Sequence, residues 1–172
     1  MEPLSIQPDT EAKGEARMEH PDQTSDSDFV FGSLMVVANR MDTMMERALS
    51  PHGITARQWF LLLVVLNLFQ TPPTLKEVAA QSGTSYQNVK QVALKLEEKG
   101  LLHLEKDRHD KRVTRLVADD RTRAFWKSLE DDGIRFMSAF FNGIPPETLR
   151  TGRYLLLALM GNMSAMETAE PG

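Results

Sequence analysis

Residues 74–117 read TLKEVAAQSGTSYQNVKQVALKLEEKGLLHLEKDRHDKRVTRLV, and this stretch decides the fold. Its first part holds two runs with apolar residues at three- and four-residue spacing, separated by Ser82-Gly83-Thr84. That spacing predicts two amphipathic helices, and the glycine between them favours a tight turn. Two short apolar runs then flank a charged loop, which is the pattern of an antiparallel hairpin. The stretch therefore predicts the order helix, turn, helix, hairpin.

Both predicted helices carry starting signals. Thr74 and Glu77 have capping-box spacing, so a short helix is expected to run from there to about Gln81. Ser85 caps the second helix, and Gly100 ends it. The expected buried side of the second helix consists of Val89, Val92, Ala93 and Leu96.

The hairpin is expected around the polar segment 106–112. Leu102 and Leu104 precede it, and three further apolar residues follow it, namely Val113, Leu116 and Val117. The charged loop should then project into solvent. A short helix that braces a second one, followed by a charged hairpin, predicts a winged helix-turn-helix over 55–118.

Further helices are expected on both sides of this unit. Apolar spacing predicts helices over 29–49, from Thr55 to about Gln70, over 120–142 and over 146–166. The run 59–66 is apolar on all sides, so its helix should be buried. In the last helix the expected buried residues are Tyr154, Leu155, Leu159 and Met163.

The charge of the chain is unevenly distributed. Residues 1–28 hold eight acids and two bases, so they carry −6, and the rest of the chain carries +2 of the total of −4. We expect this acidic segment to be a disordered tail, because it has too few large apolar groups to offset chain entropy. Residues 84–115 hold eight bases and five acids, and such local basicity is what a phosphate backbone responds to.

Composition and motifs argue against several classes of protein. The chain has no cysteine, which excludes disulfides and thiolate chemistry and suits a cytoplasmic location. No secretory signal or membrane-length apolar run is present. His20, His52, His103 and His109 show no ligand spacing, and no nucleophile elbow or phosphate loop occurs. We therefore expect no enzymatic activity, no metal and no cofactor.

The start of the second helix carries side chains that can read a major groove. Gln87 and Asn88 can pair with adenine edges, and Lys90 can reach guanine or a phosphate. Thr74 can present its hydroxyl and backbone donors to a phosphate. The full set of candidate DNA-binding residues is Thr74, Ser85, Tyr86, Gln87, Asn88, Lys90, Gln91, Lys95, Arg108, Lys111 and Arg112. The same residue types also occur on ordinary solvated helices, so the pattern alone leaves both readings open.

The stretch quoted above resembles the winged helix-turn-helix of the MarR (multiple antibiotic resistance regulator) family. Residues 107–112, DRHDKR, keep that family's D-x-x-D-x-R wing pattern, and LEEKGLL keeps its hinge into the wing. The resemblance covers about 29–166 and includes ITARQWFLLLVVL at 54–66. It implies that Arg112 enters or lines a minor groove, and that Asp107 and Asp110 shape the wing. Lys111 stands where many relatives have arginine, which keeps the charge but not the bidentate geometry.

The resemblance also implies a dimer. In that family, helices like those over 29–49 and 120–166 intertwine around a two-fold axis, so we expect 29–172 to form one MarR-like domain with N- and C-terminal dimerisation helices. The alternative is that these helices cap the winged unit of a single chain. A two-fold dimer places two recognition helices about 34 Å apart and favours a near-palindromic DNA site.

Relatives often bind a small aromatic or lipophilic effector. The residues that can line such a pocket here are Arg40, Met41, Met44, Met45, Trp59 and Phe60, although apolar residues at helical spacing are usually core. The resemblance thus implies a homodimeric, sequence-specific regulator of transcription that binds double-stranded DNA. Repression with release by such a ligand is the expected mode, and the sequence leaves activation and the existence of the ligand open. The rival hypothesis is a winged-helix module that binds a protein partner instead of DNA.

Overall fold

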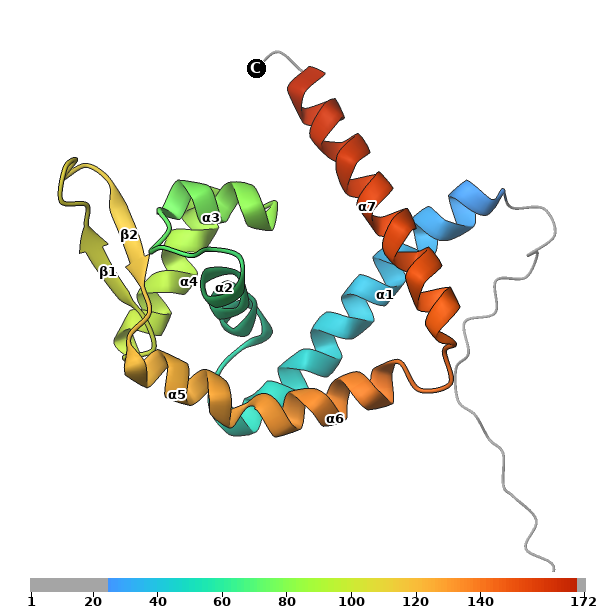
Figure 1. Cartoon of the computed structure of the whole chain (residues 1–172), viewed down its shortest axis with the longest axis horizontal. Helices are drawn as coiled ribbons and strands as arrows, with labels where there is room; N and C mark the ends of the chain where they lie inside the picture. The colour runs from blue at the N-terminus through green and yellow to red at the C-terminus, as the bar shows by residue number, and fades with distance from the viewer. Residues whose placement is uncertain (1–24, 170–172) are drawn as a thin grey trace, which may run out of the picture. The chain divides into compact units, whose positions relative to one another are not determined.

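Helices account for most of residues 25–169, the part of the chain that the computed structural model describes (Figure 1). In chain order the elements are α1 (Asp26–Leu49), η2 (Ser50–His52), α2 (Ala56–Asn67), α3 (Leu75–Ser82), α4 (Tyr86–Glu98), β1 (His103–Lys106), β2 (Thr114–Val117), α5 (Asp120–Ser128), α6 (Glu130–Phe140) and α7 (Pro146–Ala169). The chain divides after Thr43 into two compact units, and the winged helix-turn-helix lies in the second. The predicted fold class, mainly helical with a two-stranded wing, is confirmed.

Helix α1 begins at Asp26, before the predicted start at Phe29. The Ser25 hydroxyl accepts a hydrogen bond from the backbone N–H of Asp28 at 3.2 Å, which satisfies a free donor at the helix start. Asp26 and Asp28 lie in the first turn, where the helix dipole favours acids. The sequence predicted a disordered tail over residues 1–28. Residues 1–24 lie outside the part of the chain that the structure describes, and residues 26–28 belong to α1 instead.

Three short helices form the frame of the winged unit, and all three begin where the sequence predicted. Thr55 caps α2 in a capping box with Gln58, and Thr74 caps α3 in a capping box with Glu77. Ser85 caps α4 by accepting from the backbone N–H of Asn88 at 3.2 Å. Local side-chain chemistry therefore places all three helix starts.

The core of the winged unit lies where α2 packs against α3 and α4. The fully buried side chains contributed by these helices and the hairpin include Leu62, Val78, Ala93, Leu96, Leu102 and Leu116. The expectation that α2 is buried all round is wrong at Phe60, which is 45% exposed. Arg57 and Asn67 of the same helix are also exposed.

The hairpin is antiparallel and is attached to the segment before α3. His103 pairs with Val117 and Lys106 with Thr114, which leaves 107–113 as the loop. Thr74 forms an isolated antiparallel bridge with Arg115, and the backbone N–H of Leu116 donates to the carbonyl of Pro73 at 2.8 Å. The base of the wing is therefore hydrogen-bonded to the start of α3.

Gly100 follows the end of α4 and has a left-handed backbone, at φ +64°. A Cβ at this position would lie 2.7 Å from Nη1 of Arg121, the flexible end of an exposed side chain that can shift, so it is the conformation that favours glycine.

We therefore expect Gly100→Ala to lower the free energy of unfolding by about 1–2 kcal/mol, because alanine resists the left-handed region and displaces Arg121. Urea titration would measure this loss. Gly133→Ala is the matched control, since Gly133 lies in α6 with open space around it. The control should be neutral or stabilising by up to about 1 kcal/mol, and an equal loss in both variants would contradict the argument.

One predicted helix is two. The expected helix over 120–142 is interrupted at the buried Leu129, where α5 ends and α6 begins. The Leu129 N–H bonds to the carbonyl of Trp126, three residues back, and the Ser128 hydroxyl donates to the carbonyl of Phe125. Such tight turns and side-chain bonds interrupt the regular helical ladder. Trp126 also stacks on Trp59 of α2, with ring centroids 6.0 Å apart.

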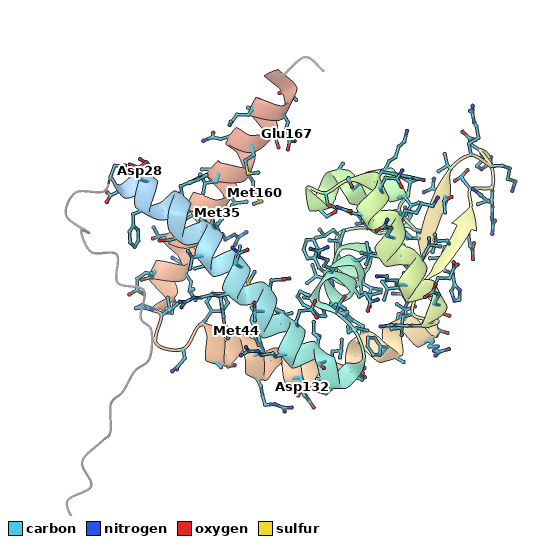
Figure 2. All side chains as sticks on the ribbon, turned by 180° about the vertical axis from the view of Figure 1, so that it is seen from behind. Asp28, Met35, Met44, Asp132, Met160 and Glu167 are labelled. Atoms are coloured by element: carbon cyan, nitrogen blue, oxygen red, sulfur yellow. The ribbon has the colours of Figure 1, made fainter. Side chains whose placement is uncertain are left out.

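Large apolar side chains are exposed along α1, α6 and α7, among them Met44 on α1 and Met160 on α7 (Figure 2). The buried side predicted for the last helix is wrong for this single chain, because Tyr154 is 66% and Met163 59% exposed. Leu155 is exposed as well, and only Leu159 is half-buried. None of the helices in residues 25–169 combines the length and hydropathy that a membrane crossing requires.

Candidate nucleic-acid interface

The start of α4 presents polar side chains to solvent. The candidate residues that are exposed on this helix or at its cap are Ser85, Tyr86, Gln87, Asn88, Lys90, Gln91 and Lys95. Val89, Ala93 and Leu96 face the core instead, so the helix separates an exposed polar side from a packing side, as the sequence predicted. Asn88 Nδ2 donates to Thr84 Oγ1 at 3.3 Å. Thr84 was not singled out from the sequence, although its position four residues before Asn88 was a signal for this contact.

Thr74 is less available to a phosphate than the sequence suggested. Its backbone N–H donates to Glu77 Oε2 at 2.6 Å, and its hydroxyl oxygen accepts from the Glu77 N–H at 3.1 Å. The backbone hydrogen bond from Thr74 lowers the pKa of Glu77, so the carboxylate stays charged beside this position. Only the Thr74 O–H remains as a donor, and the nearby negative charge opposes an anion.

The loop of the wing is organised by one carboxylate. Asp107 Oδ1 accepts from the backbone N–H groups of His109 at 2.8 Å and Asp110 at 3.0 Å, while Oδ2 accepts from Arg115 Nε at 2.5 Å. The Arg115 hydrogen bond, followed by the two backbone hydrogen bonds, holds the pKa of Asp107 well below its ordinary value. The loop is also closed by two backbone bonds: the Asp107 N–H donates to the Val113 carbonyl at 3.0 Å, and the Val113 N–H donates to the Asp110 carbonyl at 2.9 Å. The structural role predicted for Asp107 thus has a specific geometry.

Arg115 holds the wing in place, a structural role that the sequence did not reveal. Besides Asp107, its Nη1 donates to the carbonyl of Pro72 at 2.8 Å. It therefore joins the tip of the wing to the segment before α3. Sequence reasoning counted Arg115 only as a charge, whereas an acid and a base placed on opposite sides of the predicted hairpin loop were a usable signal.

The tip of the wing carries its basic residues in solvent. Arg108, Lys111 and Arg112 are exposed, and the Arg112 side chain is 91% exposed. Asp110 accepts from Arg112 Nε at 3.1 Å, from Nη2 at 3.2 Å and from its backbone N–H at 2.9 Å. These contacts, the side-chain ones first, lower the pKa of Asp110. Asp110 therefore fixes both the turn and the direction of the guanidinium.

The depressed pKa of Asp107 predicts a pH dependence. Because the pKa of Asp107 is lower in the folded chain than in the unfolded one, ionised Asp107 stabilises the fold. This stabilisation is complete above the ordinary pKa of 3.8 and is lost as the pH falls below that value. Urea unfolding of the wild-type chain and Asp107→Asn should therefore differ most near neutrality and converge on acidification. Asp131→Asn, an exposed carboxylate on α6, is the control. A difference that grows with acidity would contradict the argument.

The six candidate pocket residues are divided between the two compact units. Arg40 and Met41 belong to the first, and Met44, Met45, Trp59 and Phe60 to the second. Trp59 and Met45 pack against the core, which is the ordinary role of such residues. A separate, wide-open surface depression of about 660 Å³ is lined by residues that were not predicted to form a pocket, namely Glu46, Arg47, Ser50, Gly53, Ile54 and Thr55. Within residues 25–169, no three His, Asp or Glu side chains are grouped as a metal site requires.

Comparisons with known proteins agree with this architecture. Residues 52–113 match the model of the MarR family. A MarR-family transcriptional regulator from Rhodococcus sp. RHA1 superposes with a TM-score of 0.69 at 21% identity, covering 79% of this chain and 95% of that one. No curated protein matched the chain.

Two further solved structures are similar and have named ligands. CouR from Rhodococcus jostii RHA1, solved with p-coumaroyl-CoA, gives a TM-score of 0.67 at 22% identity over 77% of this chain and 92% of that one. BpsR from Bordetella bronchiseptica, whose DNA binding is regulated by 6-hydroxynicotinic acid, gives 0.68 at 20% identity over 80% and 96%. These structural matches show the fold, and the family model matches its winged part. Residues 52–113 thus resemble the MarR family, and the chain shares the fold of solved MarR-family regulators.

Proposed function

We propose that this chain acts in the cytoplasm as a homodimer that binds double-stranded DNA at a near-palindromic site and represses transcription. The observation that carries this proposal is the exposed polar start of α4 together with a wing whose Arg112 is held in solvent by Asp110. A major groove admits an α-helix, and a narrow minor groove attracts arginine. One winged unit can therefore engage two grooves.

The proposed roles follow from side-chain chemistry. Gln87 and Asn88 read adenine edges, and Lys90 contacts guanine or a phosphate. Tyr86 offers a ring to a thymine methyl and a hydroxyl to a phosphate. The remaining proposed backbone contacts come from Ser85, Gln91, Lys95, Arg108 and Lys111. Because base contacts specify and phosphate contacts position, changes at the first three residues should alter sequence preference most.

A second copy of the chain is the proposed cover for the exposed apolar side chains of α1, α6 and α7. Phe31, Met35, Ile134, Leu156 and Met160 are all at least 49% exposed, which is unusual for so many large side chains in one monomer. A two-fold arrangement of copies would bury them and present two recognition helices about one helical turn apart, or roughly 34 Å.

A small aromatic or lipophilic ligand is the proposed signal for release. The support is that CouR and BpsR have such ligands, p-coumaroyl-CoA and 6-hydroxynicotinic acid. A ligand that favours a dimer with the wrong spacing of half-sites would weaken DNA binding. Titrating the preformed complex with both compounds and related aromatic acids, followed by fluorescence anisotropy, tests this. Unchanged DNA affinity throughout the series would remove the support for this release mechanism.

Salt dependence provides the direct test of DNA binding. A duplex selected from random sequence with the wild-type chain should lose affinity roughly 1000-fold between 50 and 200 mM salt, if the dimer neutralises about six or more phosphates. Fluorescence anisotropy measures this slope. Failure to bind any duplex at low ionic strength would refute the proposal and favour the protein-partner hypothesis, because apolar contacts depend little on salt.

A further inference from the structure

The end of the recognition helix is tied to a distant part of the chain by one lysine. Lys99 follows α4 as its C-terminal cap. Its Nζ donates to the carbonyl of Gly53 at 2.5 Å and to Gln58 Oε1 at 2.9 Å. Both acceptors lie more than forty residues earlier, in or beside the segment Ser50–Thr55, which we call the entry segment because the chain enters the winged unit through it.

The acceptors of this lysine are themselves fixed. Gln58 is 3% exposed, and its Oε1 also accepts from the backbone N–H of Thr55 at 3.1 Å. Gly53 ends η2 with φ +71°, and its N–H bonds to the carbonyl of Ser50. An ammonium bound to two rigid, neutral acceptors has lost the freedom of a surface lysine, since charge-assisted hydrogen bonds are stronger than neutral ones.

Helix α5, through which the chain leaves the winged unit, also contacts Lys99. Arg121, in the first turn of α5, donates from Nη2 to the carbonyl of Lys99 at 3.3 Å. Its guanidinium also lies against Gly100. The side chain of Lys99 therefore holds the entry segment, while its backbone is held by α5. Motion of either connection must act on the end of α4, because packed elements move as bodies rather than deform continuously.

We propose that Lys99 is a positioning residue that couples the entry segment to α4 and thereby sets the separation of the two recognition helices in the dimer. This inference rests on the proposed function. Lys99 need not contact DNA, because it acts by fixing the direction of α4. Its loss should therefore change the preference for half-site spacing more than the contacts made within each half-site.

The test compares Lys99→Met, Lys99→Arg and wild type on three probes. The first is a duplex selected from random sequence with the wild-type chain, and the others have its central spacer lengthened or shortened by one base pair. Lys99→Met should lose about tenfold in affinity for the selected duplex and little for the other two, so that its spacing preference falls about tenfold. Lys99→Arg, which keeps N–H donors within reach, should restore the preference. Lys127→Met, an exposed lysine on α5, should behave as wild type.

The outcomes separate this inference from the proposed function. If the wild-type chain selects no duplex, both the proposed function and the role of Lys99 are refuted. If wild type binds but Lys99→Met keeps its spacing preference, or loses affinity equally for all three probes, the coupling role is overturned and DNA binding stands. Thermal melting and near-ultraviolet circular dichroism of the Trp59–Trp126 pair establish that the variant is folded. If Lys99→Met does not fold, Lys99→Gln, which is too short to bridge both acceptors, replaces it with the same expected result.

Discussion

Arg112→Ala is expected to weaken binding of a selected duplex about a hundredfold while leaving the melting temperature and the oligomeric state unchanged. A positioned arginine contributes roughly 1–3 kcal/mol to DNA affinity. A dimer carries two copies, so a loss of about 1.4 kcal/mol at each gives two factors of ten. The fold should be unaffected because the Arg112 side chain is 91% exposed and bonds only to its neighbour Asp110 among the described contacts. Fluorescence anisotropy at fixed salt measures the loss.

Arg123→Ala is the matched control for that experiment. Arg123 is also exposed, but it lies on α5 rather than on the wing. Both variants remove one positive charge per chain, so a general electrostatic effect would weaken binding equally in the two. We expect the control to change affinity less than threefold and the Arg112 variant also to reduce the salt slope. Unchanged affinity in Arg112→Ala would count against a wing that contacts DNA.

The parts of the fold that sequence predicted correctly depend on local chemistry. Thr55 and Thr74 cap helices because a hydroxyl two or three residues ahead of a free N–H can reach it whatever the rest of the chain does. Gly83 and Gly100 adopt positive φ because L-residues with a Cβ resist that region. Signals of this kind are complete within a few residues, so the sequence is sufficient to read them.

The contacts that sequence did not predict join residues far apart in the chain. Lys99 bonds to Gly53 across 46 residues and Arg115 to Pro72 across 43. Each looks like an ordinary surface base in the sequence, since its partner is a backbone carbonyl that carries no residue-specific signal. The interruption at Leu129 was missed for a different reason. Its cause is a local choice between alternative hydrogen bonds in a sequence that is helical on both sides.

The error on the last helix has a different cause. Tyr154, Leu155 and Met163 have the spacing of a buried side, yet they are exposed in one chain. Apolar periodicity predicts that a side is covered, but it does not state whether the cover comes from the same chain. For this helix the periodicity and the exposure together favour cover by a second copy, which is the dimer proposed above.

Leu96→Ala should destabilise the fold more than either Gly100→Ala or Asp107→Asn. Leu96 is on α4 and is fully buried. Removing its side chain loses apolar burial and leaves a cavity, which together cost about 3 kcal/mol. That is a large share of the free energy of unfolding of a whole domain, which is typically about 5–15 kcal/mol. It corresponds to a fall of about 10 °C in melting temperature. Urea and thermal unfolding at one fixed chain concentration would measure it, since a dimer's stability depends on concentration.

Leu94→Ala makes this prediction specific to burial. Leu94 lies two residues away on the same helix and is 40% exposed, so the same chemical change there should cost no more than about 1 kcal/mol. Both variants replace leucine with alanine in the same helix, so helix propensity cancels in the comparison.

The Leu96 variant also distinguishes the packing side of α4 from the side proposed to contact DNA. Leu96→Ala should reduce the folded fraction without altering the DNA sequence preferred by the molecules that remain folded, because its side chain faces the core. Equal losses of stability in the two variants would mean that α4 does not pack in this orientation, and the reading side assigned to its opposite face would fall with it.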